Sequence, residues 1–139
     1  MLALTALSAA YAMPRFRLQA IVQFHYDKDY PLWEYDKRAM ACTYCHVNVT
    51  GGAPWNAFGE ALRAQFVADA AAGQKNKFPQ VLYDLLKAGQ DSDGDGYSDA
   101  LEVFAKTLPA DPSSKPNKPV AQLQKEFDAA SGVEQYKPR

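Results

Sequence analysis

Both cysteines of the chain lie in one short cluster, Cys42-Thr43-Tyr44-Cys45-His46, which also holds one of its two histidines. Cysteines at positions i and i+3 of a helical turn point the same way, so the two thiols could add to the two vinyl groups along one edge of a haem. His46 would then stand beside the iron as its proximal ligand. The cluster therefore predicts a covalently attached haem.

Two other chemistries use the same residues. A Cys42–Cys45 disulfide or a thioredoxin-type redox centre has the same spacing, although no βαβ pattern precedes the cluster and neither needs the adjacent histidine. A zinc site needs four ligands, and the chain offers Cys42, Cys45, His46 and His25. His46 directly follows Cys45, and this spacing is poor for chelation. The sequence favours haem and leaves the other two alternatives open.

The cluster resembles the haem motif of c-type cytochromes, and the longer stretch "CHVNVTGG…WNAFG" is similar to a motif of some bacterial exported cytochromes. The resemblance covers roughly residues 38–66. It implies thioether bonds from Cys42 and Cys45 and proximal ligation by His46. The fold that we expect is all-α, a small helical domain like that of c-type cytochromes.

The resemblance does not extend to the ligand on the opposite side of the iron. Small electron-transfer cytochromes place a methionine well downstream of the motif, whereas no methionine follows Met40 here. Met40 precedes Cys42 by two residues and is expected on the proximal side, and Met13 could reach the iron only if the N-terminus folds over the haem. His25, on an apolar helical face, is therefore the candidate distal ligand. The alternatives are that His25 is a packed histidine and that the iron is five-coordinate.

A second candidate site is the acidic loop "DSDGDGYSDALE", residues 91–102, which fits the pattern D-x-[DN]-x-[DN]-G-x5-E at every defined position. Ca²⁺ prefers about six to eight oxygen ligands. Without a cation, so many carboxylates in one short loop would repel one another. The predicted calcium ligands are Asp91, Asp93, Asp95, the carbonyl of Tyr97, Asp99 and Glu102.

This loop resembles an EF-hand loop, with predicted helices over residues 78–89 and 100–108 on either side. Ser98 departs from the pattern of paired EF-hands, which place an aliphatic residue there, and the chain has a single such loop. The stretch "DSDGDGYSDALEVFAKTLPADP" is also similar to the calcium repeats of the thrombospondin type 3 and related bacterial extracellular kinds. That resemblance implies a structural site, which Asp111 could assist.

Helices are expected to position both sites. Apolar residues recur at helical spacing over residues 15–26, 55–72, 78–89 and 120–132, and no segment alternates like a β-strand. The side chains predicted to face the core are Leu18, Ile21, Val22 and His25; Phe58, Leu62 and Phe66; Val81, Leu82, Leu85 and Leu86; and Val120, Leu123 and Phe127. The last residues, 133–139, are expected to fray. Trp55 and Phe58 could wall the haem, and Lys37 and Arg38 could pair with its propionates.

The composition is that of one globular domain of 139 residues, 47% hydrophobic and 22% charged, with a formal net charge of −1. The absence of a basic excess argues against nucleic-acid binding. We expect a haem-binding region over residues 13–76, a calcium region over 77–111, and a Pro-rich linker with a C-terminal helix over 112–139.

Residues 1–12, "MLALTALSAAYA", resemble the end of an export signal, with an apolar run before Ala10-Tyr11-Ala12. No basic residue precedes the run, and the alternative is a short buried helix. The run is too short to span a membrane, and no other segment could do so. We therefore expect a periplasmic or extracellular protein.

Together these patterns predict an exported mono-haem c-type cytochrome that carries single electrons between redox partner proteins, braced by calcium, and not an enzyme. One alternative is a haem protein whose open iron binds small ligands. Another is a calcium-bound accessory subunit of a larger respiratory or cell-surface complex, docked through the linker and the amphipathic C-terminal helix.

Overall fold

Helices make up almost all of the regular structure in residues 14–27, 33–34 and 39–139, the part of the chain that this computed structural model describes. The α-helices are α1 Pro14–Gln23, α2 Ala57–Ala71, α3 Phe78–Lys87, α4 Asp99–Ala105 and α5 Val120–Ala129, and the 3-10 turns are η1 Cys42–Tyr44 and η2 Gly132–Tyr136. The strands β1 Trp33–Glu34 and β2 Ala39–Met40 form one short antiparallel pair. The prediction of an all-α domain is confirmed. The predicted export signal, residues 1–12, lies outside the described residues.

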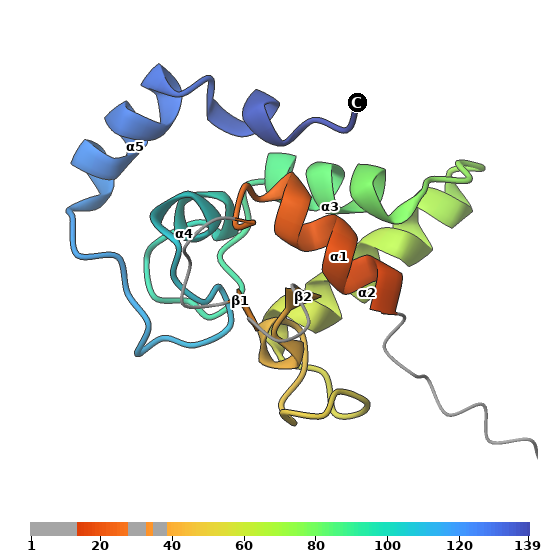
Figure 1. Cartoon of the computed structure of the whole chain (residues 1–139). Helices are drawn as coiled ribbons and strands as arrows, with labels where there is room; N and C mark the ends of the chain where they lie inside the picture. The colour runs from red at the N-terminus through yellow and green to blue at the C-terminus, as the bar shows by residue number, and fades with distance from the viewer. Residues whose placement is uncertain (1–13, 28–32, 35–38) are drawn as a thin grey trace, which may run out of the picture.

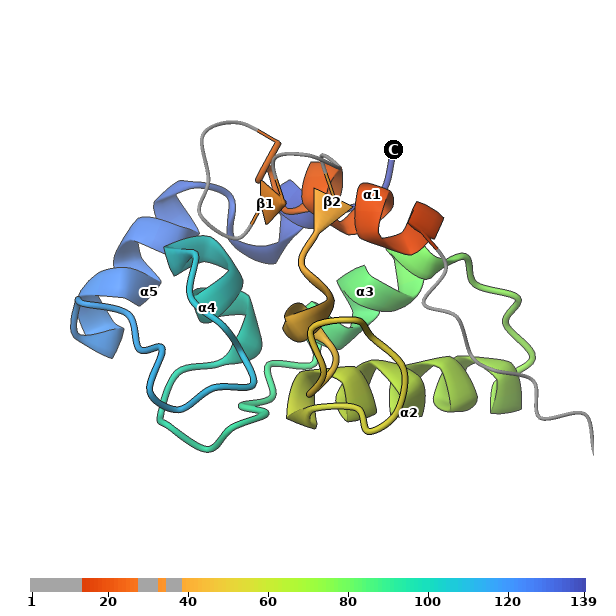
Figure 2. The same ribbon diagram turned by 60° about the horizontal axis from the view of Figure 1, so that its bottom comes forward.

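The central element is α3, which packs against α1, α2, α4 and η2 (Figures 1 and 2). Its four predicted core residues, Val81, Leu82, Leu85 and Leu86, are all buried. Phe58 and Leu62 of α2 are buried too, and Phe66 is partly buried, as the four-residue spacing predicts. None of the described helices is both long and apolar enough to cross a membrane.

The helix α1 buries a different face from the predicted one. Ile21 is buried, but Leu18 and Val22 are 46% and 61% exposed, and His25 lies beyond the end of the helix with a φ of 60°. Phe24 is buried instead, which rotates the inward face by one residue. Both rows of residues satisfy helical spacing, and burying the larger apolar ring of Phe24 gains more free energy than burying an imidazole.

The helices on either side of the acidic loop are shorter than predicted. α4 begins after Ser98, whose side chain accepts a hydrogen bond from the backbone N–H of Leu101 and so caps the helix. It ends at Ala105, because the next residue, Lys106, has a left-handed φ of 65°. α3 ends at Lys87, before Gly89, which has a φ of 70°. Ser98, which does not fit a paired EF-hand, thus has a local structural role.

The C-terminal segment turns back over α3 and ends beside α1 (Figure 1). Leu123 and Phe127 of α5 are buried, as predicted, but Val120 is 41% exposed, so the prediction is wrong for the first residue of the helix. The prediction that the last residues fray is wrong for Tyr136, which is 2% exposed. Its ring lies against Phe24, and its carbonyl accepts a hydrogen bond of 2.9 Å from Gln23 Nε2. The apolar face of this segment is therefore used within the protein.

Candidate functional site

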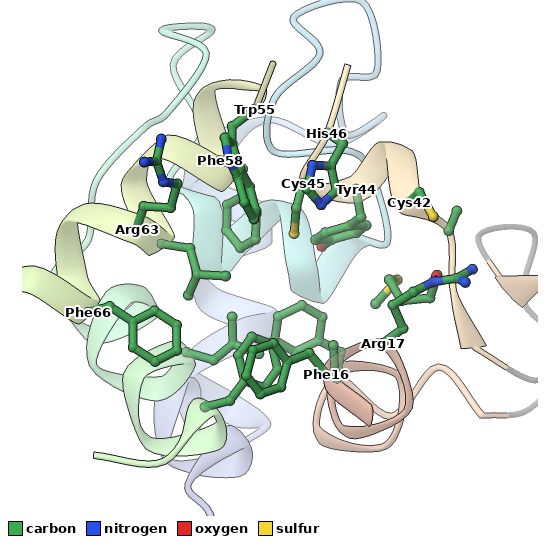
Figure 3. Close-up of a pocket in the computed structure, with 17 residues that line it drawn as sticks. Phe16, Arg17, Cys42, Tyr44, Cys45, His46, Trp55, Phe58, Arg63 and Phe66 are labelled. Atoms are coloured by element: carbon green, nitrogen blue, oxygen red, sulfur yellow. The ribbon is translucent and has the colours of Figure 1, made fainter. Parts of the chain in front are cut away.

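An apolar cavity of about 300 Å³ lies against the cysteine–histidine cluster (Figure 3). Its volume falls at the lower end of the range of small-molecule pockets, roughly 300–1,000 Å³. Cys42, Cys45 and His46 form part of its wall. Most of the rest comes from α1, β2, α2 and α3, and nearly all of those side chains are aromatic or aliphatic. The structure thus places the three motif residues at one dry, mostly apolar space.

His46 is held by its Nδ1 atom, which lies 2.7 Å from the carbonyl oxygen of Gly52. A carbonyl can only accept, so this contact puts the ring proton on Nδ1 and leaves Nε2 with a free lone pair. The turn that brings the carbonyl to the ring uses Gly51 and Gly52, with φ of 80° and 76°. One face of the imidazole ring packs on the ring of Trp55, with the two centroids 4.1 Å apart. This is the arrangement expected of an imidazole that binds a metal through Nε2.

The start of α2 is joined to the cluster by Asn56. Its Oδ1 accepts from the backbone N–H of Gly59 at 2.9 Å and caps the helix, while its Nδ2 donates to the carbonyl of Thr43 at 2.9 Å. Its backbone N–H donates to the carbonyl of Cys45 at 3.0 Å. Gly59 then lets the helix approach closely, because a Cβ there would lie 2.0 Å from the Cys45 carbonyl oxygen. The segment "WNAFG" therefore holds the cluster in place.

Replacing Asn56 separates its two roles. Asn56→Ala removes a helix cap, worth about 1 kcal/mol, and the bond to Thr43, worth roughly another 1 kcal/mol. Asn56→Ser keeps a capping oxygen and loses only the bond to Thr43. In urea unfolding we expect Ala to lower the free energy of unfolding about twice as much as Ser. Equal losses in the two variants would contradict the capping role.

The two cysteines are free thiols, and the pKa of Cys45 is raised to about 12, first by desolvation of its sulfur and then by Cys42. A thioredoxin-type centre depends on a lowered thiol pKa, so the raised pKa of Cys45 argues against it. Among the described residues, the only cluster of three or more metal-ligating side chains lies elsewhere, in the acidic loop. The geometry of the cluster therefore favours neither the redox nor the zinc alternative.

His25 is not brought to the cavity. It is exposed, its ring lies 5.6 Å from that of Tyr136, and it lines a separate groove between α1, the start of α3 and the C-terminus. Trp55 and Phe58, which were predicted to lie against the haem, line the cavity. Lys37 and Arg38 lie outside the described residues.

Sequence reasoning missed two charged cavity residues, Arg17 and Arg63, which lie on different sides of the cavity in Figure 3. Met40, which was expected on the proximal side, lines the cavity too. Arg17 donates a hydrogen bond from Nε to the backbone carbonyl of Met40. No local spacing signals these residues, because they meet the cluster only through the packing of α1 and α2.

The acidic loop gathers three carboxylates. Asp91, Asp93 and Asp95 each present one oxygen, and these oxygens all lie within 4.8 Å of one another. Asp91 is fixed by the backbone, since its two oxygens accept from the N–H groups of Gly94 and Gly96, both at 2.8 Å. Such a group of hard oxygen ligands on a tight turn suits Ca²⁺.

Glu102, at the end of the loop pattern, is fully buried. Burial, and then Asp93 and Asp95, raise its pKa to about 9. Among the described residues, Glu102 Oε2 and one oxygen each of Asp93 and Asp95 are buried without a hydrogen-bond partner. A bare carboxylate is costly to bury, and a divalent cation would satisfy all three oxygens. The residues therefore fit a calcium ion.

The remaining predicted ligands have defined partners. Asp99 accepts from the backbone N–H and the hydroxyl of Ser92, at 2.8 and 2.6 Å. Tyr97 donates its hydroxyl to the carbonyl of Lys118 at 2.8 Å and so ties the loop to the Pro-rich linker. Asp111, suggested as a helper, accepts through Oδ1 from the backbone and the hydroxyl of Ser113.

Comparison with known families identifies one segment of the chain. The family model of the bacterial TSP3 repeat matches residues 91–112, which include the whole acidic loop. We found no significant match among curated proteins or solved structures. These comparisons give no support to the haem motif, which rests on its residues and their geometry. The chain thus carries a bacterial TSP3 repeat of the calcium-binding type, with a separate cysteine–histidine site beside an apolar cavity.

Proposed function

We propose that this protein is an exported mono-haem c-type cytochrome that carries single electrons, with calcium bracing its second half. The observation that carries the proposal is that His46, whose Nδ1 is held by the Gly52 carbonyl, lines the same apolar cavity as Cys42 and Cys45. Haem would supply a one-electron Fe(II)/Fe(III) couple there. Export is supported by the TSP3 repeat, a type usual in extracellular or exported proteins.

Each neighbouring group has a defined task in this proposal. Cys42 and Cys45 would hold the haem edge as thioethers, and the Gly52 carbonyl would orient His46 and increase its basicity. The aromatic walls exclude water, which adjusts the potential. Arg17 and Arg63 supply positive charge suited to the propionates. None of these roles requires a catalytic residue.

The accessory-subunit alternative has less support. It relied on a free amphipathic C-terminal helix for docking, but Leu123 and Phe127 are buried against the protein itself, with Phe127 packed on Phe104. We therefore favour a carrier that meets its redox partner proteins transiently.

The test is covalent haem. The full chain is produced with an export signal in a host that attaches c-type haem, denatured, and stained for haem after electrophoresis. We expect a stained band and a single one-electron wave in a redox titration. The double variant Cys42→Ser/Cys45→Ser should lose the stain, and His25→Gln should keep it. An unstained wild-type protein that is otherwise folded would overturn the proposal.

A further inference from the structure

Met40 lies in the wall of the cavity but outside the motif. It is 2% exposed and ends β2, which packs on α1. Since Arg17 Nε bonds to the Met40 carbonyl, α1 fixes the position of the β2 backbone. Met40 therefore reaches the cavity from the side of α1, where Figure 3 shows Phe16 and Arg17. His46 reaches it from the side of Trp55 and α2.

Few other side chains at this cavity could bind iron. The guanidinium groups of Arg17 and Arg63 stay protonated and have no lone pair to offer. Tyr44 lies between the two cysteines, so it approaches from the side of the motif. His25 lines the other groove. Among the described residues that line the cavity, Met40 has the one uncharged ligand atom that lies outside the motif.

We infer that the thioether of Met40 is the sixth ligand of the haem iron, an inference that rests on the function proposed above. A thioether is a soft ligand suited to haem iron, and three rotatable bonds let methionine adapt its reach. Axial methionine opposite histidine raises the potential. The iron is then closed to outside ligands, as a carrier of electrons requires, and the ligand precedes the motif in the chain.

The test is the spectrum of the haem-loaded full chain. Ferric haem with a methionine ligand shows a weak near-infrared sulfur-to-iron charge-transfer band, which we expect in the wild type. Met40→Leu conserves volume, so the fold should lose less than about 1.5 kcal/mol. The variant should lose the band, and its ferric form should bind added imidazole about tenfold more tightly or better. That gain follows because a ligand bound in about nine-tenths of molecules leaves only the remainder open.

Two matched variants complete the design. Met13→Leu removes the other methionine that a cleaved chain would retain, and His25→Gln removes the other histidine. Both should keep the band and the wild-type imidazole affinity. Loss of the band in Met13→Leu alone would overturn the assignment to Met40.

A second measurement covers the case in which Met40→Leu does not fold. In the reduced wild type with ¹³C-labelled methionine methyls, the ring current of the haem should shift one methyl strongly upfield. Covalent haem with neither the band nor the shifted methyl would mean that Met40 is only a packing residue, and would leave the proposed cytochrome intact. Absence of covalent haem would overturn both.

Discussion

Calcium should raise the melting temperature of this protein, and by more at pH 8 than at pH 5. The reason lies in Glu102, Asp93 and Asp99, whose pKa values are raised to about 9, 6 and 6, first of all by burial. At calcium a hundredfold above its dissociation constant, binding adds about 2.7 kcal/mol. For a chain of this length, that corresponds to roughly 5 to 10 °C. Scanning calorimetry with calcium and with chelator measures it.

The sign of the pH effect follows from proton binding. Without calcium, the folded protein keeps Glu102 protonated up to a pH of about 9, whereas the unfolded chain releases that proton near 4.5. The calcium-free fold therefore loses stability as the pH rises through this window. Calcium binds the ionised carboxylates, so protons compete with it at low pH. The gap between the two melting temperatures must widen as the pH rises.

Glu102→Gln tests the same site without a change of shape. It removes the buried charge, so the calcium-free variant should be more stable than the wild type at pH 8 and less dependent on pH. Its calcium affinity should fall by about tenfold or more, since even residues behind a ligand often cost that much. Glu60→Gln, on an exposed surface pair, is the control and should change little. Coincident melting curves with and without calcium at pH 8 would refute the structural role of the loop.

The variant Gly59→Ala should destabilise the protein by about 1–3 kcal/mol, the usual range for overpacking. At an ordinary helical position the same change stabilises by about 1 kcal/mol, because alanine is the better helix former. Here the new Cβ would lie 2.0 Å from the Cys45 carbonyl oxygen and 2.9 Å from Trp55 Cε3. Since the nearest neighbour is backbone, α2 and the cluster must move apart.

The control for Gly59→Ala is Ala64→Gly, an exposed position in the same helix. It should lose only the helix propensity of alanine, about 1 kcal/mol. Urea unfolding at one fixed calcium concentration gives both values. A Gly59→Ala variant more stable than the wild type would show that the helix does not press on the cluster.

Local periodicity was enough to predict most of the helices. Phe58 and Leu62 lie four residues apart in α2, and α3 contains an apolar run. Each of these two helices therefore has a single face that can point to the core. In α1 two rows of residues compete, and only the packing of Phe24 against Tyr44 and Tyr136 selects between them. Tyr136 could not be predicted to be buried, because its contacts come from the far end of the chain.

The two candidate sites also differ in how much of each can be predicted from the sequence. The acidic loop is contiguous, so its residue types and spacing contain nearly the whole site. The cavity beside His46 depends on Arg17, Met40 and Arg63, which come from separate elements. The packing of the helices puts Met40 in the wall of this cavity and His25 in the other groove, and local spacing in a sequence does not show that packing.

Gln23 at the end of α1 and Tyr26 just after it form hydrogen bonds with residues far along the chain. Tyr26 donates to the carbonyl of Val103, and Gln23 to that of Tyr136, across 77 and 113 residues. A chain emerging from the ribosome or a membrane pore presents α1 first, long before either partner exists. The helix α1, which lines the cavity, can therefore complete its packing only after η2 has emerged. In the cytochrome proposed above, the enzymes that attach haem would therefore meet Cys42 and Cys45 before α1 has packed beside them.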